Sequence, residues 1–259
     1  MARTSLDSLG QVHLARDKAR LHDDLAQTLL AAAFHAIEER GVFHLALSGG
    51  STPEPFYMNL VIDPRWRGIP WQKTHLWLVD ERCVPETDDR SNWKMIRETL
   101  ADHVPLKQRQ LHPMPVMQAD AGSAYERELR DVIVGQSPGD LVPMLDFVLL
   151  GMGDDGHTAS LFPDSPALQE REKLVTHNDG PTAKPPIRLT MTYPLLHAAR
   201  ALALLVTGAG KAAMLQTIAR QLQDQGPDPA RYPVTGLPLM SDQVTWFMDA
   251  AAAGAASTL

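Results

Sequence analysis

The chain of 259 residues contains a single cysteine, Cys83, which excludes an internal disulfide and leaves nothing that requires an oxidising compartment. A small space-filling role suits Cys83 better than a reactive one. The chain also lacks any run of about 18 uninterrupted apolar residues, the length of a membrane span, and residues 1–14 lack the apolar core of a secretion signal. These absences predict a cytoplasmic protein that does not enter a membrane.

Positive charge is scarce as well, because 24 Lys and Arg stand against 31 Asp and Glu and give a formal net charge of -7. Binding to the phosphate backbone of a nucleic acid depends on clustered Lys and Arg that release counterions. The sequence therefore predicts no nucleic-acid partner. Any phosphate group that the protein binds should be small and held locally.

Apolar residues make up 44% of the chain and occur in alternating helical and strand-like patterns. A helix is predicted over 15–40, with Gly41 as its C-cap. Strands are predicted at 42–47, 75–79, 146–150 and 201–207, each followed by a polar or glycine-rich loop, and further strands at 187–192 and 244–247. The alternation predicts an α/β fold with a mainly parallel, doubly wound, Rossmann-like sheet, whose loops at the carboxyl ends of the strands converge on a ligand.

Two proline-rich stretches, 181–186 and 226–238, are predicted to be loops. Neither separates segments of different composition, so we expect one compact domain over 1–259. Its ends, about 1–10 and 250–259, are expected to be frayed.

The most informative segment is 149–160, which follows a buried apolar run and carries a titratable pair, Asp155 and His157. Three glycines in six residues of this segment, including Gly153, allow backbone conformations that other residues resist. A tight strand-to-helix turn with solvated aspartates is the alternative, but an active site explains the glycines better. A metal held by Asp154, Asp155 and His157 is disfavoured because no further His or carboxylate lies nearby in sequence, so no metal is predicted.

The loop 48–52 has the outline of a phosphate cradle between a strand and a helix. Gly49 and Gly50 expose backbone N–H groups, Ser51 and Thr52 add hydroxyl donors, and a helix N-terminus favours an anion. The alternative is an ordinary turn that caps the helix, because such a turn is made of the same residue types. The loop lacks both the lysine of a nucleotide-binding loop and the spaced glycines of a dinucleotide site, so neither ATP nor NAD is indicated.

Three cations are candidates to bind a dianionic phosphate beside this cradle: Arg82, Arg188 and Lys211. Each lies where a predicted strand ends or a loop begins, but each is also open to a simpler interpretation as a solvated charge or, for Arg82, as the partner of the acids before it. Asn92, which follows Ser91 before a predicted helix at 93–100, is either a site residue or part of an N-cap.

Five segments in this order and spacing closely resemble the 6-phosphogluconolactonase family of the glucosamine-6-phosphate isomerase-like superfamily. The segments are Leu47-Ser48-Gly49-Gly50-Ser51-Thr52-Pro53, Val79-Asp80-Glu81-Arg82-Cys83-Val84-Pro85 with Ser91-Asn92, 151–163, Arg188-Leu189-Thr190 and 208–211. The resemblance extends from about residue 15 to 248. It implies hydrolysis of 6-phospho-D-glucono-1,5-lactone to 6-phosphogluconate, the second step of the oxidative pentose phosphate pathway, without a metal or organic cofactor. The partner implied is this small sugar-phosphate lactone, and the protein is expected to be a monomer or a small homo-oligomer.

Within this resemblance His157 is the natural general base, because a free imidazole has a pKa of about 6.5 and is largely neutral at cellular pH. Asp155 would orient the ring or stabilise its cation, and Asp80 is a competing base or a polar anchor. Ser51, Thr52, Arg188 and Lys211 would hold the phosphate, with Gly49, Gly50, Asn92 and Gly153 as further substrate-binding candidates. Arg82 would bind either the phosphate or the developing oxyanion.

Two related functions are less consistent with the sequence. Glucosamine-6-phosphate deaminases resemble the chain at the glycine loops, but they have a glutamate where this chain has Phe162 and a tyrosine where it has Arg82. Sugar-phosphate sensors of transcription regulators carry an N-terminal helix-turn-helix, whereas a single helix is predicted here before the first strand. Ser160 is not proposed as a nucleophile because the Gly-x-Ser-x-Gly elbow of covalent esterases is absent.

Overall fold

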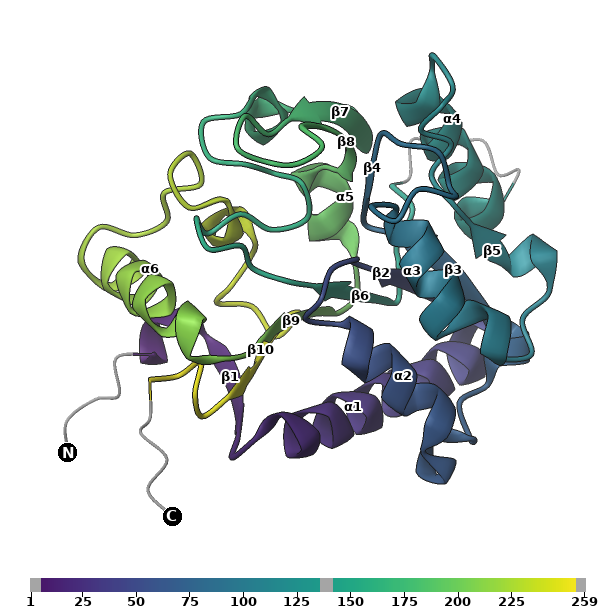
Figure 1. The fold of residues 1–259 in the computed structure, drawn as a ribbon, viewed down its shortest axis with the longest axis horizontal. Coiled ribbons are helices and arrows are strands. Elements are labelled where there is room, and N and C mark those ends of the chain that lie inside the picture. The colour runs from purple at the N-terminus through teal and green to yellow at the C-terminus, as the bar shows by residue number, and fades with distance from the viewer. Residues whose placement is uncertain (1–5, 136–141, 255–259) are drawn as a thin grey trace.

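A computed structural model describes residues 6–135 and 142–254 of the chain (Figure 1). Its strands are β1 (Gln11–Ala15), β2 (Phe43–Leu47), β3 (Thr74–Leu78), β4 (Asp80–Arg82), β5 (Leu111–His112), β6 (Phe147–Leu150), β7 (Val175–Asp179), β8 (Ile187–Met191), β9 (Leu202–Val206) and β10 (Val244–Asp249). Its α-helices are α1 (Lys18–Arg40), α2 (Glu54–Ile62), α3 (Asn92–Thr99), α4 (Ala121–Leu129), α5 (Tyr193–Ala198) and α6 (Ala212–Asp224). No described helix is both long and apolar enough to cross a bilayer.

The main sheet has seven strands in the order β1-β10-β9-β6-β2-β3-β5, and every neighbouring pair in it is parallel. The four strands predicted with following loops correspond to β2, β3, β6 and β9 to within one residue at each end, and they are adjacent in the sheet. The prediction of a mainly parallel α/β fold is therefore confirmed. The C-cap prediction is also confirmed, because Gly41 has a φ of 78° and donates to the carbonyl oxygen of Ile37.

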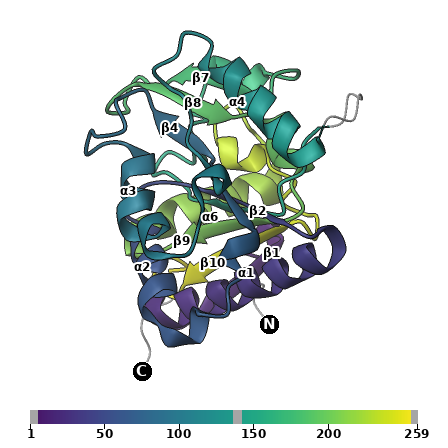
Figure 2. The ribbon, with the colours of Figure 1, turned by 90° about the vertical axis from the view of Figure 1, so that its right-hand side faces the viewer.

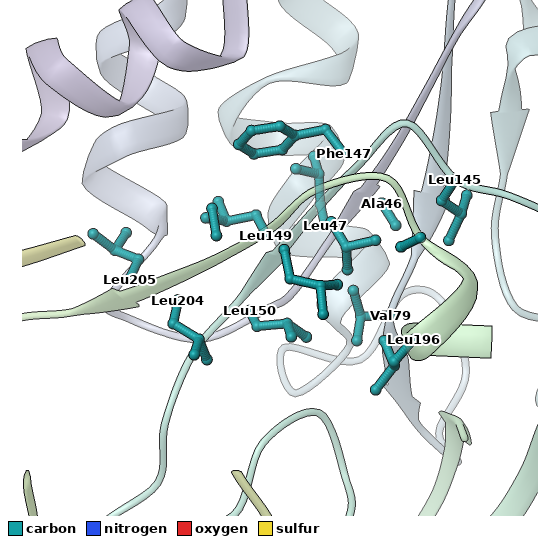
Figure 3. Packing of buried hydrophobic residues seen from close by; sticks show 14 of the residues in the cluster. Ala46, Leu47, Val79, Leu145, Phe147, Leu149, Leu150, Leu196, Leu204 and Leu205 are labelled. Atoms are coloured by element: carbon teal, nitrogen blue, oxygen red, sulfur yellow. The ribbon is translucent and has the colours of Figure 1, made fainter. Parts of the chain in front are cut away.

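The central strands are buried on both faces, as parallel strands covered by other layers must be. All residues of β2, β6 and β9 are buried. Phe147 and Leu149 point to one side of the sheet and Leu150 to the other, where it lies among Val79 and Leu196 (Figure 3). Figures 1 and 2 show α1 and α2 on one side of the sheet and the strands β4, β7 and β8 with α4 on the opposite side.

The structure corrects three expectations. A strand, β1, precedes the first helix, which starts at Lys18, because the edge strand pairs with β10 and needs no apolar run of its own. The polar residues of β4 and the predicted strand β8 do not join the main sheet but form an antiparallel three-stranded sheet with β7.

The third correction concerns the frayed ends. Fraying is wrong for Asp7–Leu9, which form a 3-10 turn with Leu9 fully buried, and for Ala252, which is also fully buried. Residues 1–5 and 255–259 lie outside the described part, and the single domain over 1–259 stays a prediction.

A cluster of three histidines lies on β2, β3 and β5, near the amino-terminal ends of these strands. Nδ1 of His75 lies 2.8 Å from Nε2 of His112, and Nδ1 of His112 lies 2.6 Å from Oε1 of Glu128. Trp77 stacks on His112 at 3.7 Å and donates its Nε1 hydrogen to Nδ1 of His44. Burial, and then the neighbouring imidazoles, lower the pKa of His44 to about 3 and that of His75 to about 4.

This cluster predicts a loss of stability in mild acid. His44 stays neutral in the folded protein down to a pH near 3 and His75 down to a pH near 4, whereas in the unfolded chain both take up protons below about pH 6.5. We therefore expect the free energy of unfolding, measured by urea titration, to fall steadily between about pH 6.5 and 4. His44→Gln should flatten this decline and His35→Gln, at an exposed position of α1, should not. An equal slope in wild type and His44→Gln would contradict the assignment.

Candidate active site

The chain turns in opposite directions across the main sheet at β2 and β6. From β2 it continues to β3 and β5, whereas from β6 it continues to β9 on the other side. Such a switch point leaves a crevice at the carboxyl ends of the strands, where ligands of open α/β sheets bind. A pocket of about 370 Å³ lies there, between the loops that follow β2 and β6 and the small sheet. We call it the switch-point pocket.

Ten of the twelve predicted site residues line the switch-point pocket. They are Gly49, Gly50, Ser51, Thr52, Asp80, Arg82, Asn92, Gly153, His157 and Arg188. Asp155 lies behind His157, and Lys211 lies outside the pocket. Residues far apart in the chain, from loops after three strands and from both sheets, are thus brought to one cavity.

His157 and Asp155 form a close pair after β6. Nδ1 of His157 lies 2.6 Å from Oδ1 of Asp155, and the same oxygen accepts the His157 backbone N–H. Burial alone would raise the pKa of the Asp155 carboxyl, but its hydrogen bond with His157 and the other contacts outweigh burial and lower that pKa. Because an ionised carboxylate only accepts hydrogen bonds, a neutral ring carries its proton on Nδ1 and its lone pair on Nε2. Among the described residues, none bonds to Nε2, so it is available to a molecule in the pocket.

Glycines in the loop after β6 make room for the imidazole ring of His157. A Cβ on Gly153 would lie 2.1 Å from Nδ1 of His157, so only glycine leaves room for the imidazole there. Gly156 has a φ of 82°, in the left-handed region that glycine adopts without strain. On its other side the ring contacts Phe162, with ring centroids 4.9 Å apart. The segment 149–160 therefore fixes His157 between a carboxylate, a backbone and an aromatic ring.

Gly153→Ala is expected to displace the imidazole and lower kcat of the proposed reaction by about 100-fold, because an error of about 1 Å in a catalytic group has that effect. Gly68→Ala is the matched control, since Gly68 lies outside the switch-point pocket and a Cβ on it meets no atom within 4 Å. Steady-state kinetics of both variants test this. Equal kcat values for Gly153→Ala and Gly68→Ala would mean that the position of the ring is not set by Gly153.

The loop after β2 presents unpaired backbone donors. The N–H groups of residues 49–52 make no hydrogen bond within the part of the chain that the structure describes, although all four residues line the pocket. The first N–H groups of a helix have no acceptor within it, so this row before α2 is open to water or to an anion. The Asn92 side chain packs directly on Gly49, where a Cβ would lie 1.8 Å from Oδ1 of Asn92.

Glu81 and Asp80 stabilise the wall of the switch-point pocket that lies next to this loop. The buried Glu81 carboxylate accepts the backbone N–H groups of Asn92 and Trp93 and the hydroxyl of Ser91, which fixes the N-terminus of α3. Burial raises the pKa of Glu81 despite these bonds. Asp80 is buried, lines the pocket and accepts the Ser160 hydroxyl at 2.6 Å.

Arg82 and Arg188 are brought opposite each other by the antiparallel pairing of β4 and β8. Nη1 of Arg82 donates to the carbonyl oxygen of Arg90, and Nε of Arg188 donates to that of Pro185. Burial, and then the positive charge of Arg82, lower the pKa of Arg188. Two guanidinium groups that face one pocket repel each other, and an anion between them would relieve the repulsion.

Lys211 departs from expectation. Its ammonium group forms an ion pair with Asp154 at the protein surface and does not line the pocket. The loop after β9 lies one strand beside the switch point, on the far side of β6 from β2. A role of Lys211 in binding phosphate stays a prediction and requires that this ion pair open.

Eight further lining residues are not among the site residues predicted from the sequence: Ser48, Pro53, Gly151, Met152, Ala159, Ser160, Phe162 and Ala183. Phe162 was noted only as a difference from deaminases. Ala183 lies in the proline-rich loop 181–186, whose composition indicates a loop but gives no sign that it closes over a site. Within residues 6–135 and 142–254, no group of three or more His, Cys, Asp or Glu side chains is arranged to hold a metal ion.

These features define a doubly wound α/β protein with two arginines, a row of unpaired backbone N–H groups and a histidine–aspartate pair at its switch point. Residues 16–246 match the protein family described as "Glucosamine-6-phosphate isomerases/6-phosphogluconolactonase". The chain belongs to this family.

Named relatives agree with this assignment. The chain is 41% identical over 202 residues to a 6-phosphogluconolactonase of Synechocystis, covering 76% of this chain and 80% of that one. It is 40% identical over 233 residues to the "GDH/6PGL endoplasmic bifunctional protein" of Oryctolagus cuniculus; the match covers 87% of this chain but only 28% of that longer relative. The crystal structure of a 6-phosphogluconolactonase from Thermotoga maritima superposes with a TM-score of 0.76 at 27% identity, over 93% of this chain and 99% of that one.

Proposed function

We propose that the protein hydrolyses 6-phospho-D-glucono-1,5-lactone to 6-phosphogluconate, as in the oxidative pentose phosphate pathway. The observation that carries the proposal is one pocket lined both by His157, with Asp155 behind it, and by residues 49–52 with their four unpaired N–H groups. The names of the relatives at about 40% identity support the substrate.

His157 acts as the general base in this proposal. Nε2 accepts a proton from a water molecule as the water oxygen attacks C1 of the lactone, and Asp155 stabilises the imidazolium that forms. When the tetrahedral intermediate collapses, the bond between C1 and the ring oxygen breaks and Nε2 returns the proton to that oxygen. Water and lactone thus give a carboxylic acid and a hydroxyl group without a covalent enzyme intermediate. Asp80 stays a candidate for a second base or a polar anchor.

The phosphate is assigned to the other side of the pocket. The N–H groups of residues 49–52, the hydroxyls of Ser51 and Thr52 and the guanidinium of Arg188 supply donors, and Arg82 binds either phosphate or the oxyanion. Binding at this remote group fixes C1 against His157 and supplies energy for catalysis. Lys211 would join after release from Asp154.

The deaminase alternative is disfavoured by Phe162. Its ring is buried against His157 at the position where that enzyme has the glutamate that assists ring opening. An apolar ring cannot transfer a proton.

A rapid coupled assay with freshly generated 6-phosphogluconolactone tests the proposal. We expect hydrolysis well above the spontaneous rate and no ammonia release from glucosamine 6-phosphate. A rate equal to that of buffer alone would refute the lactonase assignment. The same assay after treatment with a chelator should show unchanged turnover.

We also propose that the protein works in the cytoplasm, as a monomer or small homo-oligomer without nucleic acid. The names of its relatives include chloroplastic and endoplasmic proteins, so the compartment needs a direct test by cell fractionation.

A further inference from the structure

A second pocket lies at the opposite end of the main sheet from the switch-point pocket. It has a volume of about 490 Å³ and lies where α2 ends and β3 begins, next to the segment after α3. Pro53 before α2 and Asn92 in α3 line the switch-point pocket, whereas Leu60 in α2 and Val104 beyond α3 line this one. The helices α2 and α3 therefore both run from one cavity to the other. We call the second one the distal pocket.

The walls of the distal pocket are apolar and firmly built. Leu60, Trp66, Ile69 and Trp71 line it and are each at most 8% exposed. Backbone hydrogen bonds link Trp66, Ile69 and Trp71 in succession, and the buried Gln110 side chain donates to the carbonyl oxygen of Trp71. Two indole rings in one wall suit a flat apolar group.

The rim of the distal pocket is positively charged. Arg67, Lys73 and His103 line it together with the apolar residues, and no Asp or Glu does within the described chain. Arg67 and Lys73 are exposed and form no ion pair with any described residue, which is unusual in a chain with a net charge of -7.

An unsatisfied donor lies in the same wall. Nε1 of Trp66 is buried and has no hydrogen-bond acceptor among residues 6–135 and 142–254. A buried N–H group without an acceptor is costly, and buried indoles normally have a partner. Because this atom has almost no exposed surface, an anion in the pocket would reach it only after the Trp66 ring moved.

We propose that the distal pocket is a second binding site, for an organic anion with a flat apolar body. The body packs against Trp66 and Trp71, and a carboxylate, sulfonate or phosphate group lies at Arg67 and Lys73. Both halves of the pocket are needed, because the apolar walls alone would not select an anion and the exposed cations alone would bind it weakly. This site is independent of the proposed lactonase reaction.

The fluorescent aryl sulfonate 8-anilinonaphthalene-1-sulfonate is a suitable probe. We expect one saturable site on the wild-type protein, and binding about tenfold or more weaker in the Arg67→Ala/Lys73→Ala double variant. The matched control, Lys18→Ala/Arg220→Ala, removes the same charge from α1 and α6 and should bind as wild type does. Equal binding by the two double variants, or no binding by the wild type, would overturn the proposal.

Three further measurements locate and define the ligand. Arg188→Ala should leave binding of the sulfonate unchanged, and a loss there would assign the probe to the switch-point pocket instead. The uncharged N-phenyl-1-naphthylamine should bind at least about tenfold more weakly, and equal affinity would overturn the requirement for an anion. Displacement of the probe by 1-naphthoate or by adenosine monophosphate distinguishes a carboxylate from a phosphate ligand; displacement by neither contradicts the proposal.

Discussion

His157→Ala is expected to lower kcat for 6-phosphogluconolactone by about 100-fold to 10,000-fold, the usual contribution of a positioned general base. The reason is that Nε2 is the pocket's one imidazole nitrogen free of a described partner, while Nδ1 is held by Asp155. Binding of the product, 6-phosphogluconate, should change little, because the phosphate donors lie elsewhere in the pocket. Stopped-flow kinetics and calorimetric binding measure the two quantities separately.

The control for this variant is another histidine–aspartate pair. Nε2 of His13 lies 2.8 Å from Oδ2 of Asp24, outside the switch-point pocket, so His13→Ala removes a similar contact without touching the site. Its kcat should match that of wild type. Near-normal kcat for His157→Ala, with the enzyme otherwise active on the lactone, would remove His157 from the mechanism.

Arg188→Ala is expected to raise KM about tenfold to a hundredfold with a smaller change in kcat, because a charge-assisted hydrogen bond contributes about 1.5–3 kcal/mol. Arg188 is 6% exposed and lies beside Arg82, so its removal relieves repulsion between two cations and should leave the fold intact. Lys211→Ala should raise KM no more than about fivefold, since its ammonium group is already paired with Asp154 at the surface.

A substrate without phosphate separates binding of that group from general damage. Hydrolysis of D-glucono-1,5-lactone should be slow in the wild type and equally slow in Arg188→Ala. Arg188→Lys, which keeps the charge but not the bidentate geometry, should recover part of the lost affinity. Wild-type KM in Arg188→Ala would show that the phosphate is held without this residue.

Much of the framework could be predicted because its signals are local. The apolar runs of β2, β3, β6 and β9 and the C-cap at Gly41 follow from periodicity and from the special conformations of glycine. Polar β4 and half-exposed β1 could not be predicted in this way, because each is a strand only through pairing with a segment more than 100 residues away.

The candidate site shows the same division. Glycines and a titratable pair after a buried strand were sufficient to select Asp155 and His157, and the structure places their side chains in contact. Nothing in the amino-acid sequence distinguishes Arg188, which lines the pocket, from Lys211, which does not. In the structure, pairing of β8 with β4 places Arg188 at the pocket, whereas Lys211 is paired with Asp154 outside it.

The sequence by itself determined the central strands β2, β3, β6 and β9, which residue types follow them and hence the kind of chemistry that the protein can perform. The tertiary structure alone decided which of those loops share a cavity. It did so through the switch point between β2 and β6 and through the register that sets Arg82 opposite Arg188. The physical reason is range: side-chain periodicity and glycine conformations act over a few residues, whereas strand order and register depend on hydrogen bonds between distant segments.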